Sequence, residues 1–551
     1  MRMEWLTGFT GSWGFVAVLK TQAAAFVDGR YTIQAAQEID AQLFEIVCTL
    51  DTTVNDWLIA HVPQGARLGY DPWLHTRDGL EQIGKVLTPK NVTLVALDEN
   101  PLDTFWSNRP PPPLSITKLH DEKYSGENAA SKLQRIRKEL KEKGATHLVV
   151  TQTDNLAWTF NVRGNDIEHT PLTFGFAIIG ENDAQIFMDS RKVKDNVREA
   201  LKGQAIFHDI ADFKAALKNL ADGQSVLVDS SASVVAISET VKSSKARLVE
   251  GTDPITLMKA QKNATEIEGA RIAHRRDGAA LARFLFWFEN ADKARLTEMD
   301  MIEALYRCRH ETGALQDTSF ETICGSGPNG AIAHYRVTPQ SNSKLIDNSL
   351  IVLDSGGQYF EGTTDITRTL FVGTPTDEMK KHFTLVLKGM IAVSMARFPK
   401  GTRGIQLDTL ARQPLWNAGF DYDHGTGHGV GSYLGVHEGP ASISKRSAPQ
   451  LETGMIMSNE PGYYIAGGYG IRIENLVLVT DPAQIRGGNR AMHGFETLTL
   501  APIEQRLILA DLLDAEERNW LNAYHARVVK EIGPQLKADE AAWLAKICTA
   551  L

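Results

Sequence analysis

A repeated segment most constrains how this chain can fold. Residues 14–18 (GFVAV) resemble residues 175–179 (GFAII), and an aspartate turn follows each copy at the same distance. The two turns read Phe-Val-Asp28-Gly-Arg30 and Phe-Met-Asp189-Ser-Arg191. Apolar strands that end in matching turns at a fixed separation indicate duplication of one α/β unit. The sequence therefore predicts two related α/β domains before its last large domain.

Linker and capping signals divide the chain further. Four consecutive prolines at 110–113 open a polar stretch through residue 123, which predicts a linker rather than a docking ligand. Asn263 with Glu266 forms a capping box that predicts a long helix through Phe288. A second box, Asp514 with Glu517, predicts a helix near the end of the chain. We expect three domains, at residues 1–118, 119–256 and 257–551.

Composition excludes several classes of protein. With 43% hydrophobic and 23% charged residues, the chain of 551 is not disordered, collagen-like or coiled-coil. A net charge of -9 does not provide the excess positive charge that binding to nucleic acid or an anionic membrane requires, so neither is expected as a partner. The four cysteines have no short spacing that would suggest disulfides or a thiolate metal site: Cys48, Cys308, Cys324 and Cys548.

An apolar stretch near the start bears on localisation. Residues 5–19 carry no charge and resemble a signal peptide. Glu4 spoils the positive flank, however, and three glycines interrupt the apolar core, which is also too short to span a bilayer. Together with the scattered cysteines, this favours a reduced, cytoplasmic protein over a secreted one.

Two aspartates begin the region that carries chemistry. Residues 350–354 read as a strand ending in Asp354, and glycines at turn positions lead back to Asp365. Hairpin pairing is expected to place the two aspartates face to face. A buried like-charge pair needs a shared proton or a cation between its members. The alternative is a pair of hydrated turn aspartates.

Histidines cluster downstream of these aspartates. His424 and His428 stand four residues apart, as in helical zinc motifs, but glycines at 425, 427 and 429 exclude a helix there. His437 follows within the same cluster. A lone histidine is usually structural, yet glycines beside these allow close backbone approach to a ligand.

Two glutamates complete an oxygen-rich set. Pro461 imposes extended backbone on Glu460, and strand alternation is expected to put Arg472 on the same face as Glu474. Two aspartates, two glutamates and one histidine on adjacent strands predict a dinuclear site whose negative charges are balanced by two divalent cations. Such hard ligands favour manganese, with cobalt, zinc or iron as alternatives.

The motifs resemble those of aminopeptidase P, the Xaa-Pro aminopeptidases, of the creatinase, prolidase and methionine aminopeptidase superfamily. The matching segments stand in family order: 353–356 (LDSG), 362–369 (GTTDITRT), 424–431 (HGTGHGVG), 436–440 (VHEGP), 459–463 (NEPGY) and 470–475 (GIRIEN). The resemblance is closest to the long, three-domain cytosolic type. It implies an α/β (α+β) protein, in which two related creatinase-like N-terminal domains precede a pita-bread catalytic domain, with the first domain shortened at its start.

The resemblance also implies roles for individual residues. The metal ligands would be five residues, with Asp365 and Glu474 bridging: Asp354, Asp365, His428, Glu460 and Glu474. Three histidines would contact substrate: His334, His424 and His437. Arg30 matches a position that contacts the bound peptide, across a homodimer interface. Arg472 would orient a carboxylate ligand.

The implied reaction releases the N-terminal residue from peptides with proline in second position. A hydroxide bridging two metals would attack the carbonyl before proline, with Glu460 as proton shuttle and His437 and His334 stabilising the charges that develop. One alternative is a prolidase acting on Xaa-Pro dipeptides, against which the two N-terminal domains argue. Another is a non-catalytic binding protein of the same fold, against which the complete ligand set argues.

Overall fold

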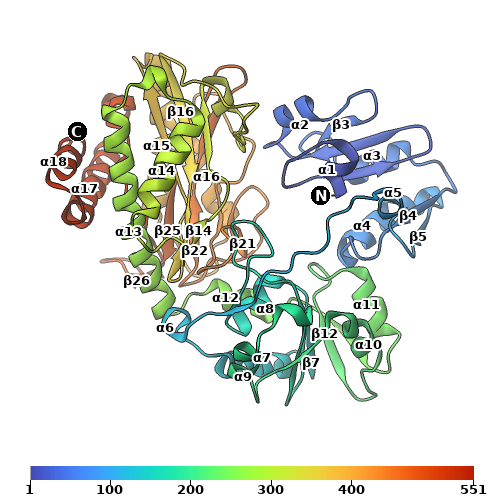
Figure 1. Cartoon of the computed structure of the whole chain (residues 1–551). Coiled ribbons are helices and arrows are strands. Elements are labelled where there is room, and N and C mark those ends of the chain that lie inside the picture. Colours follow the sequence, from blue (N-terminus) through green and yellow to red (C-terminus); the bar gives the residue numbers. More distant parts are fainter. Residues whose placement is uncertain (1) are drawn as a thin grey trace. The chain divides into compact units, whose positions relative to one another are not determined.

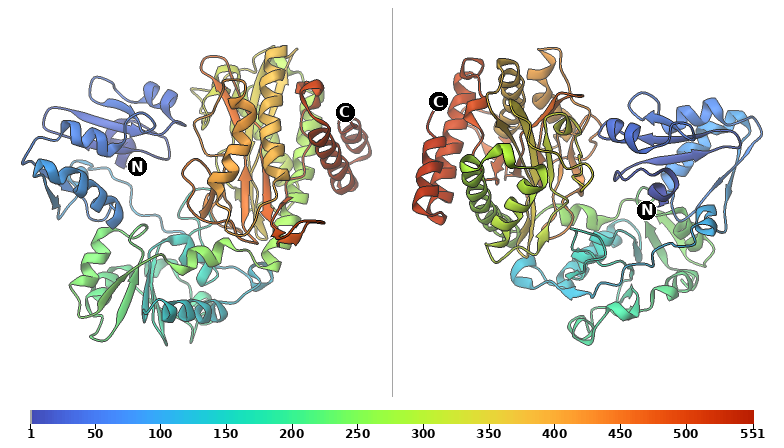
Figure 2. Two further views of the ribbon diagram at one scale, coloured as in Figure 1. Left: turned by 180° about the vertical axis from the view of Figure 1, so that it is seen from behind. Right: turned by 45° about the horizontal axis from the view of Figure 1, so that its top comes forward.

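The structure is a computed structural model that describes residues 2–551 and forms two compact units. The first unit holds most of the chain up to Leu257. The second unit holds Met258–Leu551 together with two short segments, Lys123–Gly126 and Glu168–Thr170. Figure 1 shows the ribbon with its elements labelled, and Figure 2 shows it turned. In the described part of the chain, no helix combines the length and the apolar character that a membrane crossing requires.

The first unit contains the same three-stranded arrangement twice. In each copy an antiparallel hairpin is extended by a parallel third strand: β1 (Phe15–Val18), β2 (Ala23–Val27) and β3 (Glu45–Cys48), then β9 (Phe176–Ile179), β10 (Ala184–Phe187) and β11 (Ile206–His208). The turns after β2 and β10 match at the atomic level. Arg30 and Arg191 each bind the aspartate two residues before them through Nε and Nη2, at 2.9 and 2.7 Å. The predicted duplication is confirmed by this repeated geometry.

The two copies differ at one strand position. In the second copy, β7 (His147–Val150) joins β9 to the parallel strands β12 (Ser225–Val228) and β13 (Arg247–Glu250), giving one six-stranded sheet. Among the residues described, the first copy has no such strand. Its β4 (Arg67–Tyr70) and β5 (Thr93–Ala96) form a separate parallel pair. A shared hydrophobic core around Trp57 nevertheless packs against both of its sheets.

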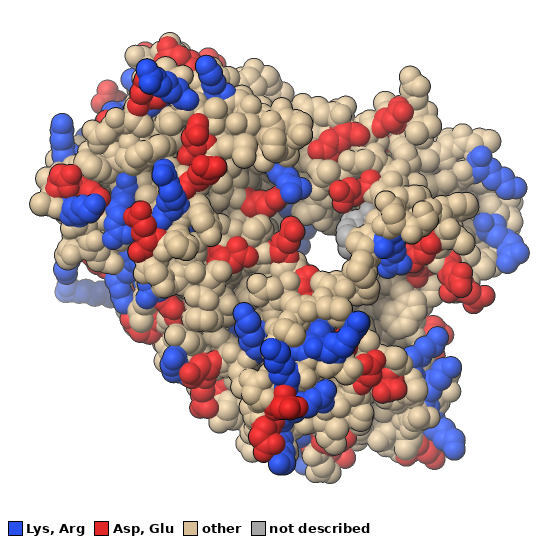
Figure 3. All heavy atoms as spheres, viewed as in Figure 1, with Lys and Arg blue, Asp and Glu red and all other residues tan. Residues whose placement is uncertain are grey.

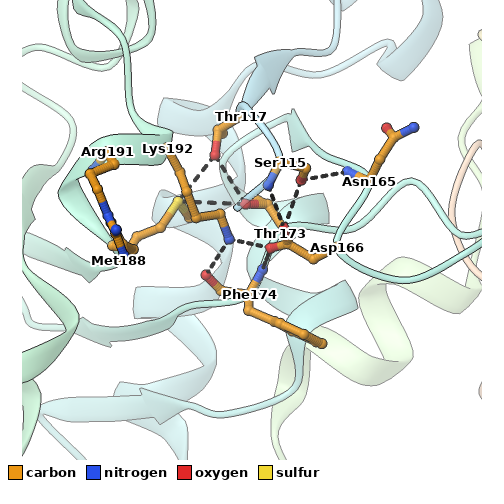
Figure 4. A network of polar contacts seen from close by, with 10 residues as sticks. Ser115, Thr117, Asn165, Asp166, Thr173, Phe174, Met188, Arg191 and Lys192 are labelled. Atoms are coloured by element: carbon orange, nitrogen blue, oxygen red, sulfur yellow. Dashed lines mark hydrogen bonds and ion pairs between the residues drawn. The ribbon is translucent and has the colours of Figure 1, made fainter. Parts of the chain in front are cut away.

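The segment after the four prolines is anchored on the second copy. Ser115 donates from Oγ to Asp166 at 2.7 Å, and Phe174 donates its backbone N–H to the same carboxylate at 2.6 Å. Lys192 forms a buried ion pair with Asp166 and also contacts the Phe174 carbonyl at 3.2 Å (Figure 4). Thr117 reaches the sulfur of Met188 at 3.2 Å in this network. The linker is therefore fixed from Ser115 onward, because a buried carboxylate depends on these donors.

The second unit combines curved sheets with long helices, which lie along their outer side in Figures 1 and 2. The helices are α13 (Ala264–Asn290), α14 (Glu298–His310), α15 (Asp377–Met395), α16 (Gly404–Trp416), α17 (Ala515–Ile532) and α18 (Ala538–Ile547). Both predicted capping boxes are confirmed, at Asn263 with Glu266 and at Asp514 with Glu517. Large apolar side chains of α15 and α17 fill the main core between helices and sheet.

Two sheets of this unit position the candidate site. One has the order β15 (Ile323–Ser326), β16 (Ser349–Ser355) and β19 (Ile366–Val372). The other has the order β21 (Glu438–Ile443), β20 (Gly427–Gly429), β22 (Ile456–Asn459), β25 (Asn475–Val479) and β28 (Phe495–Thr497). Smaller pieces lie beside them: β14 (Asp317–Thr318), β17 (Gly357–Tyr359), β18 (Gly362–Thr363), β23 (Gly462–Ile465) and β24 (Tyr469–Arg472).

A fully buried arginine ties these sheets together. Arg368 of β19 donates to the backbone carbonyls of Glu474, Ala501 and Pro502 at 2.6 to 2.9 Å. It also reaches the hydroxyl of Tyr524 in α17 at 3.0 Å. Because a guanidinium offers five donors in a rigid fork, one side chain satisfies carbonyls from several loops at once. The backbone of Glu474 is thereby held in place.

Surface charge is mixed in sign. Figure 3 shows Lys and Arg side chains interspersed with Asp and Glu over the face in view. This pattern is consistent with the small net charge of -9.

Candidate metal centre and substrate site

The second unit brings the predicted metal ligands together. Asp354 is the penultimate residue of β16, Asp365 precedes β19, and Glu474 stands between β24 and β25; all three are buried. One ligand atom each from Asp365, His428 and Glu474 lie within 4.8 Å of one another. His428 Nε2 also lies 3.4 Å from Glu460 Oε1. Strands far apart in the sequence thus converge on one acidic cluster.

The electrostatics of this cluster are unfavourable without a cation. Burial raises the pKa of Asp365 well above its ordinary value, and the charges of Glu474, Asp354 and Glu460 raise it further. Burial likewise raises the pKa of Glu474, with Glu460 and Asp354 adding to the effect. Four carboxylates that share a buried volume repel one another unless protons or cations neutralise them.

The donor atoms fit divalent cations. Asp354 Oδ1 and Glu474 Oε1 are buried and have no hydrogen-bond partner among the described residues. His428 Nδ1 lies 3.0 Å from the Gly429 carbonyl, which can only accept, so Nε2 is the nitrogen that faces the carboxylates, 3.5 Å from Asp365 Oδ2. Unsatisfied buried oxygens beside an imidazole nitrogen make a hard, anionic ligand set.

Close backbone packing explains the glycines beside His428. A Cβ at Gly427 would collide with the carbonyl of Ser458, and one at Gly429 would collide with the carbonyl of Glu438. Ser458 accepts the His428 backbone N–H at 2.9 Å and donates to Glu460 Oε1 at 3.0 Å. Sequence reasoning missed Ser458. Its position two residues before Glu460, on the same face of an extended segment, was the available signal.

Arg472 links the acidic cluster to His424. It donates to Asp354 Oδ2 and to the hydroxyl of Tyr464, each at 2.6 Å. His424 Nδ1 faces the Gly425 carbonyl at 2.8 Å, which leaves Nε2 to accept from the Tyr464 hydroxyl at 2.9 Å. Burial raises the pKa of Tyr464 to about 12, so its hydroxyl stays protonated. The sequence predicted the orienting contact of Arg472 but not the tyrosine between it and His424.

The predicted register of the aspartates is wrong. Asp354 lies opposite Thr367, and not opposite Asp365, because β16 and β19 pair through Ser355 and Ile366. The chain between them leaves the hairpin to form β17 and β18. Thr367 fills the facing position and donates to Glu474 Oε2 at 2.9 Å.

The other predicted substrate residues occupy different surroundings. His437 is exposed, and its ring centroid lies 4.1 Å from that of His428. His334 is half-buried and follows the short helix η5 (Gly327–Ala331), whose Gly330 packs against the backbone of Gly470. Arg30 belongs to the first unit and pairs with Asp28 of its own turn.

A histidine beside β14 yields a prediction on pH. His169 Nδ1 lies 2.9 Å from Thr318 Oγ1 and 3.3 Å from Asp317 Oδ1, and the hydrogen bond to Asp317 raises the pKa of His169 above 6.5. The pairing is present below the raised value and is lost as the pH rises through it. We expect an NMR titration to give His169 a pKa above 6.5, which falls in Asp317→Asn. A wild-type value at or below 6.5 would contradict the pairing.

Family models match almost the whole chain. The model for metallopeptidase family M24 matches residues 268–481, and that for the C-terminal region of peptidase M24 matches residues 491–551. Two models for the creatinase/prolidase N-terminal domain match residues 1–103 and 108–266. The chain therefore consists of two creatinase-like α/β domains followed by an M24 pita-bread domain, as the sequence motifs implied.

Named relatives agree along the full length. Aminopeptidase P2 of Arabidopsis thaliana is 39% identical, with 98% of this chain and 81% of the relative covered. A probable Xaa-Pro aminopeptidase P of Laccaria bicolor is 39% identical, with 100% and 88% covered. The crystal structure of an X-prolyl aminopeptidase from Caenorhabditis elegans, described as a cytosolic enzyme with a di-nuclear active site, matches with a TM-score of 0.95 and 34% identity over 100% of this chain and 92% of that one. The chain is an enzyme that belongs to the Xaa-Pro aminopeptidase P group of metallopeptidase family M24.

Proposed function

We propose that this enzyme removes the N-terminal residue from peptides with proline in second position. The observation that carries the proposal is the convergence of Asp365, His428 and Glu474 on one site, where two buried carboxylate oxygens, Asp354 Oδ1 and Glu474 Oε1, have no hydrogen-bond partner among the described residues. Relatives that align with the whole chain are named for that activity.

The proposed cofactor is a pair of divalent metal ions, with manganese favoured by the hard oxygen ligands over cobalt, zinc or iron. The residues proposed to hold them are Asp354, Asp365, His428, Glu460 and Glu474. When bound, the ions would supply Lewis-acid polarisation of a carbonyl and a nucleophilic hydroxide at neutral pH. Asp365 and Glu474 would each supply carboxylate oxygens to this site, as their proximity supports.

The protein side chains have separate proposed roles. Glu460 would accept the proton of the attacking nucleophile and pass it to the leaving nitrogen. Its Oε1 is oriented by Ser458, which supports that role. His437 and His334 would donate hydrogen bonds to the developing oxyanion and leaving group. His424, held through Tyr464, would contact the substrate.

Proline in second position poses a particular recognition problem. Its amide nitrogen carries no hydrogen, so a peptidase that grips this hydrogen has nothing to bind. A shaped pocket must hold the ring instead, while the free amino terminus lies near the metals. Because the free amino terminus of the substrate must lie in the site, the proposed enzyme is an exopeptidase.

Assembly and location follow from the family resemblance. The proposed enzyme is a homodimer in which Arg30 contacts the peptide bound by the partner protomer, and its proposed location is the cytoplasm. The worm relative described as cytosolic supports the location. The proposed domains span residues 1–118, 119–256 and 257–551.

Cleavage assays with added manganese test the proposal. We expect release of the first residue from an Xaa-Pro-Xaa tripeptide, little release when alanine replaces proline, and little hydrolysis of an Xaa-Pro dipeptide. A chelator should abolish the activity, and manganese should restore it. Hydrolysis of the dipeptide alone would identify a prolidase. A folded protein with two bound metals and no peptidase activity would instead support the binding-protein alternative.

A further inference from the structure

A buried glutamate lies outside the acidic cluster and has no part in the mechanism above. Glu298 is the first residue of α14, and its side chain has an exposed fraction of 0%. It forms no ion pair with any described residue. A buried carboxylate without a cation is costly unless hydrogen bonds satisfy its oxygens. The surroundings of Glu298 therefore indicate what it holds in place.

Each oxygen of Glu298 accepts hydrogen bonds from one loop. Oε1 accepts from the Ser326 backbone at 2.8 Å and from Asn329 Nδ2 at 3.0 Å. Oε2 accepts from the backbone N–H and the hydroxyl of Ser343, at 3.2 and 3.1 Å, and lies 3.0 Å from the Tyr335 hydroxyl. Backbone N–H groups can only donate, so both oxygens must be acceptors. This arrangement requires a carboxylate rather than an amide.

The loop closed by these contacts carries His334. It runs from Ser326, at the end of β15, to Ser343, and contains η5 as well as His334. The hydroxyl of Tyr335, the next residue, accepts from Asn329 Nδ2 at 2.9 Å, and its one proton is shared between Glu298 Oε2 at 3.0 Å and the Ser341 carbonyl at 2.8 Å. His334 and Tyr335 share one backbone, so holding Tyr335 in place restricts the position from which the His334 side chain projects.

The same loop starts from a strand that pairs with the strand bearing Asp354. Ile323 of β15 lies opposite Asp354 of β16, so the loop begins three residues from that register point. Gly330 in η5 packs against the backbone of Gly470, two residues before Arg472. Glu298 thus holds the loop that carries His334 through backbone and side-chain contacts, and this loop packs beside the strand that bears Asp354.

We propose that Glu298 is a positioning residue for His334, acting through Tyr335 and the loop 326–343. The inference rests on the proposed function, in which His334 donates to the group that develops charge. Glu298→Gln keeps the size of the side chain but replaces one accepting oxygen by an NH₂ group, which can only donate. The N–H and O–H groups that face this position then lose their acceptor. The loop should then relax, and His334 should lose its alignment.

Kinetics of the metal-loaded enzyme test this role. For Glu298→Gln we expect kcat on the tripeptide to fall by roughly 10- to 100-fold, with little change in KM and with two metals still bound. Glu303→Gln, an exposed glutamate on the same helix, is the matched control and should behave as wild type. If Glu298 acts through His334, the loss should nearly disappear in a His334→Ala background. Fully additive losses in that double-mutant cycle would overturn the proposal.

A second variant keeps the test decisive if Glu298→Gln fails to fold. Tyr335→Phe removes only the hydroxyl that joins Glu298 to the residue after His334, and it should lower kcat several-fold with the same dependence on His334. Wild-type kcat in Tyr335→Phe would overturn the proposal. The two proposals fail in different ways. If the wild-type enzyme does not cleave the tripeptide, the proposed function is wrong. If the wild-type enzyme is active and both variants match its kcat, the inference about Glu298 is wrong.

Discussion

Asp365→Asn should abolish peptidase activity, by at least about 10³-fold, and should remove bound metal. Asp365 lies in the group whose ligand atoms are within 4.8 Å of one another, and it is one of the proposed metal ligands. An amide offers one neutral oxygen in place of a carboxylate, so it cannot balance the charge of divalent cations. Elemental analysis should find two metals per wild-type chain and fewer than one in the variant.

The same substitution should stabilise the metal-free protein. Burial and three neighbouring carboxylates make an Asp365 charge unfavourable, and the neutral amide removes that repulsion. We expect the free energy of unfolding without metal to rise by about 1 kcal/mol or more. In excess manganese the order should reverse, because binding stabilises the wild type by about 2.7 kcal/mol at a hundred times Kd.

An exposed aspartate provides the control for both effects. Asp481 lies outside the cluster, so Asp481→Asn should change neither the metal content nor the unfolding midpoint. Full metal occupancy in Asp365→Asn would contradict the ligand assignment. A metal-free variant that is less stable than metal-free wild type would contradict the account of charge repulsion.

Features specified by neighbouring residues were predictable from the sequence. The capping boxes that begin α13 and α17 depend on side chains three residues apart, and both formed as expected. The duplicated turns at Asp28 and Asp189 are equally local, since each arginine bonds the aspartate two residues before it. The glycines beside His428 correctly excluded a helix, because close backbone packing requires them there.

Features set by distant residues were not predictable from patterns alone. The register of Asp354 depends on an excursion through β17 and β18 that hairpin rules do not describe. Tyr464 of β23 joins Arg472 of β24 to His424, which precedes β20, and its role appears only when these segments are assembled. Glu438, next to His437, is buried against Lys259 and Lys262, which stand far back in the sequence. Such ion pairs leave no local signal.

Arg472→Lys should damage the site although it keeps the positive charge. The guanidinium contacts three groups in different directions: Thr367 Oγ1 at 3.2 Å, and the Tyr464 hydroxyl and Asp354 Oδ2 at 2.6 Å each. A lysine keeps the charge but presents one ammonium, which cannot span all three. We expect kcat/KM to fall by about 10- to 100-fold. The free energy of unfolding should fall by about 3 kcal/mol, because a buried ion pair loses its geometry.

Comparison with Tyr464→Phe separates the two contacts of Arg472, one to Asp354 and one to the Tyr464 hydroxyl. The phenylalanine variant keeps the Arg472 contact to Asp354 and removes only the link to His424, so its metal content should remain complete and its loss should be smaller. Arg446→Lys, at an exposed position, should leave both activity and stability unchanged. Activity assays, elemental analysis and urea unfolding of the three variants show which of these two contacts matters more for activity, metal content and stability. If Arg472→Lys retained wild-type activity and stability, Arg472 would serve only to balance charge, because any cation at that position would then suffice.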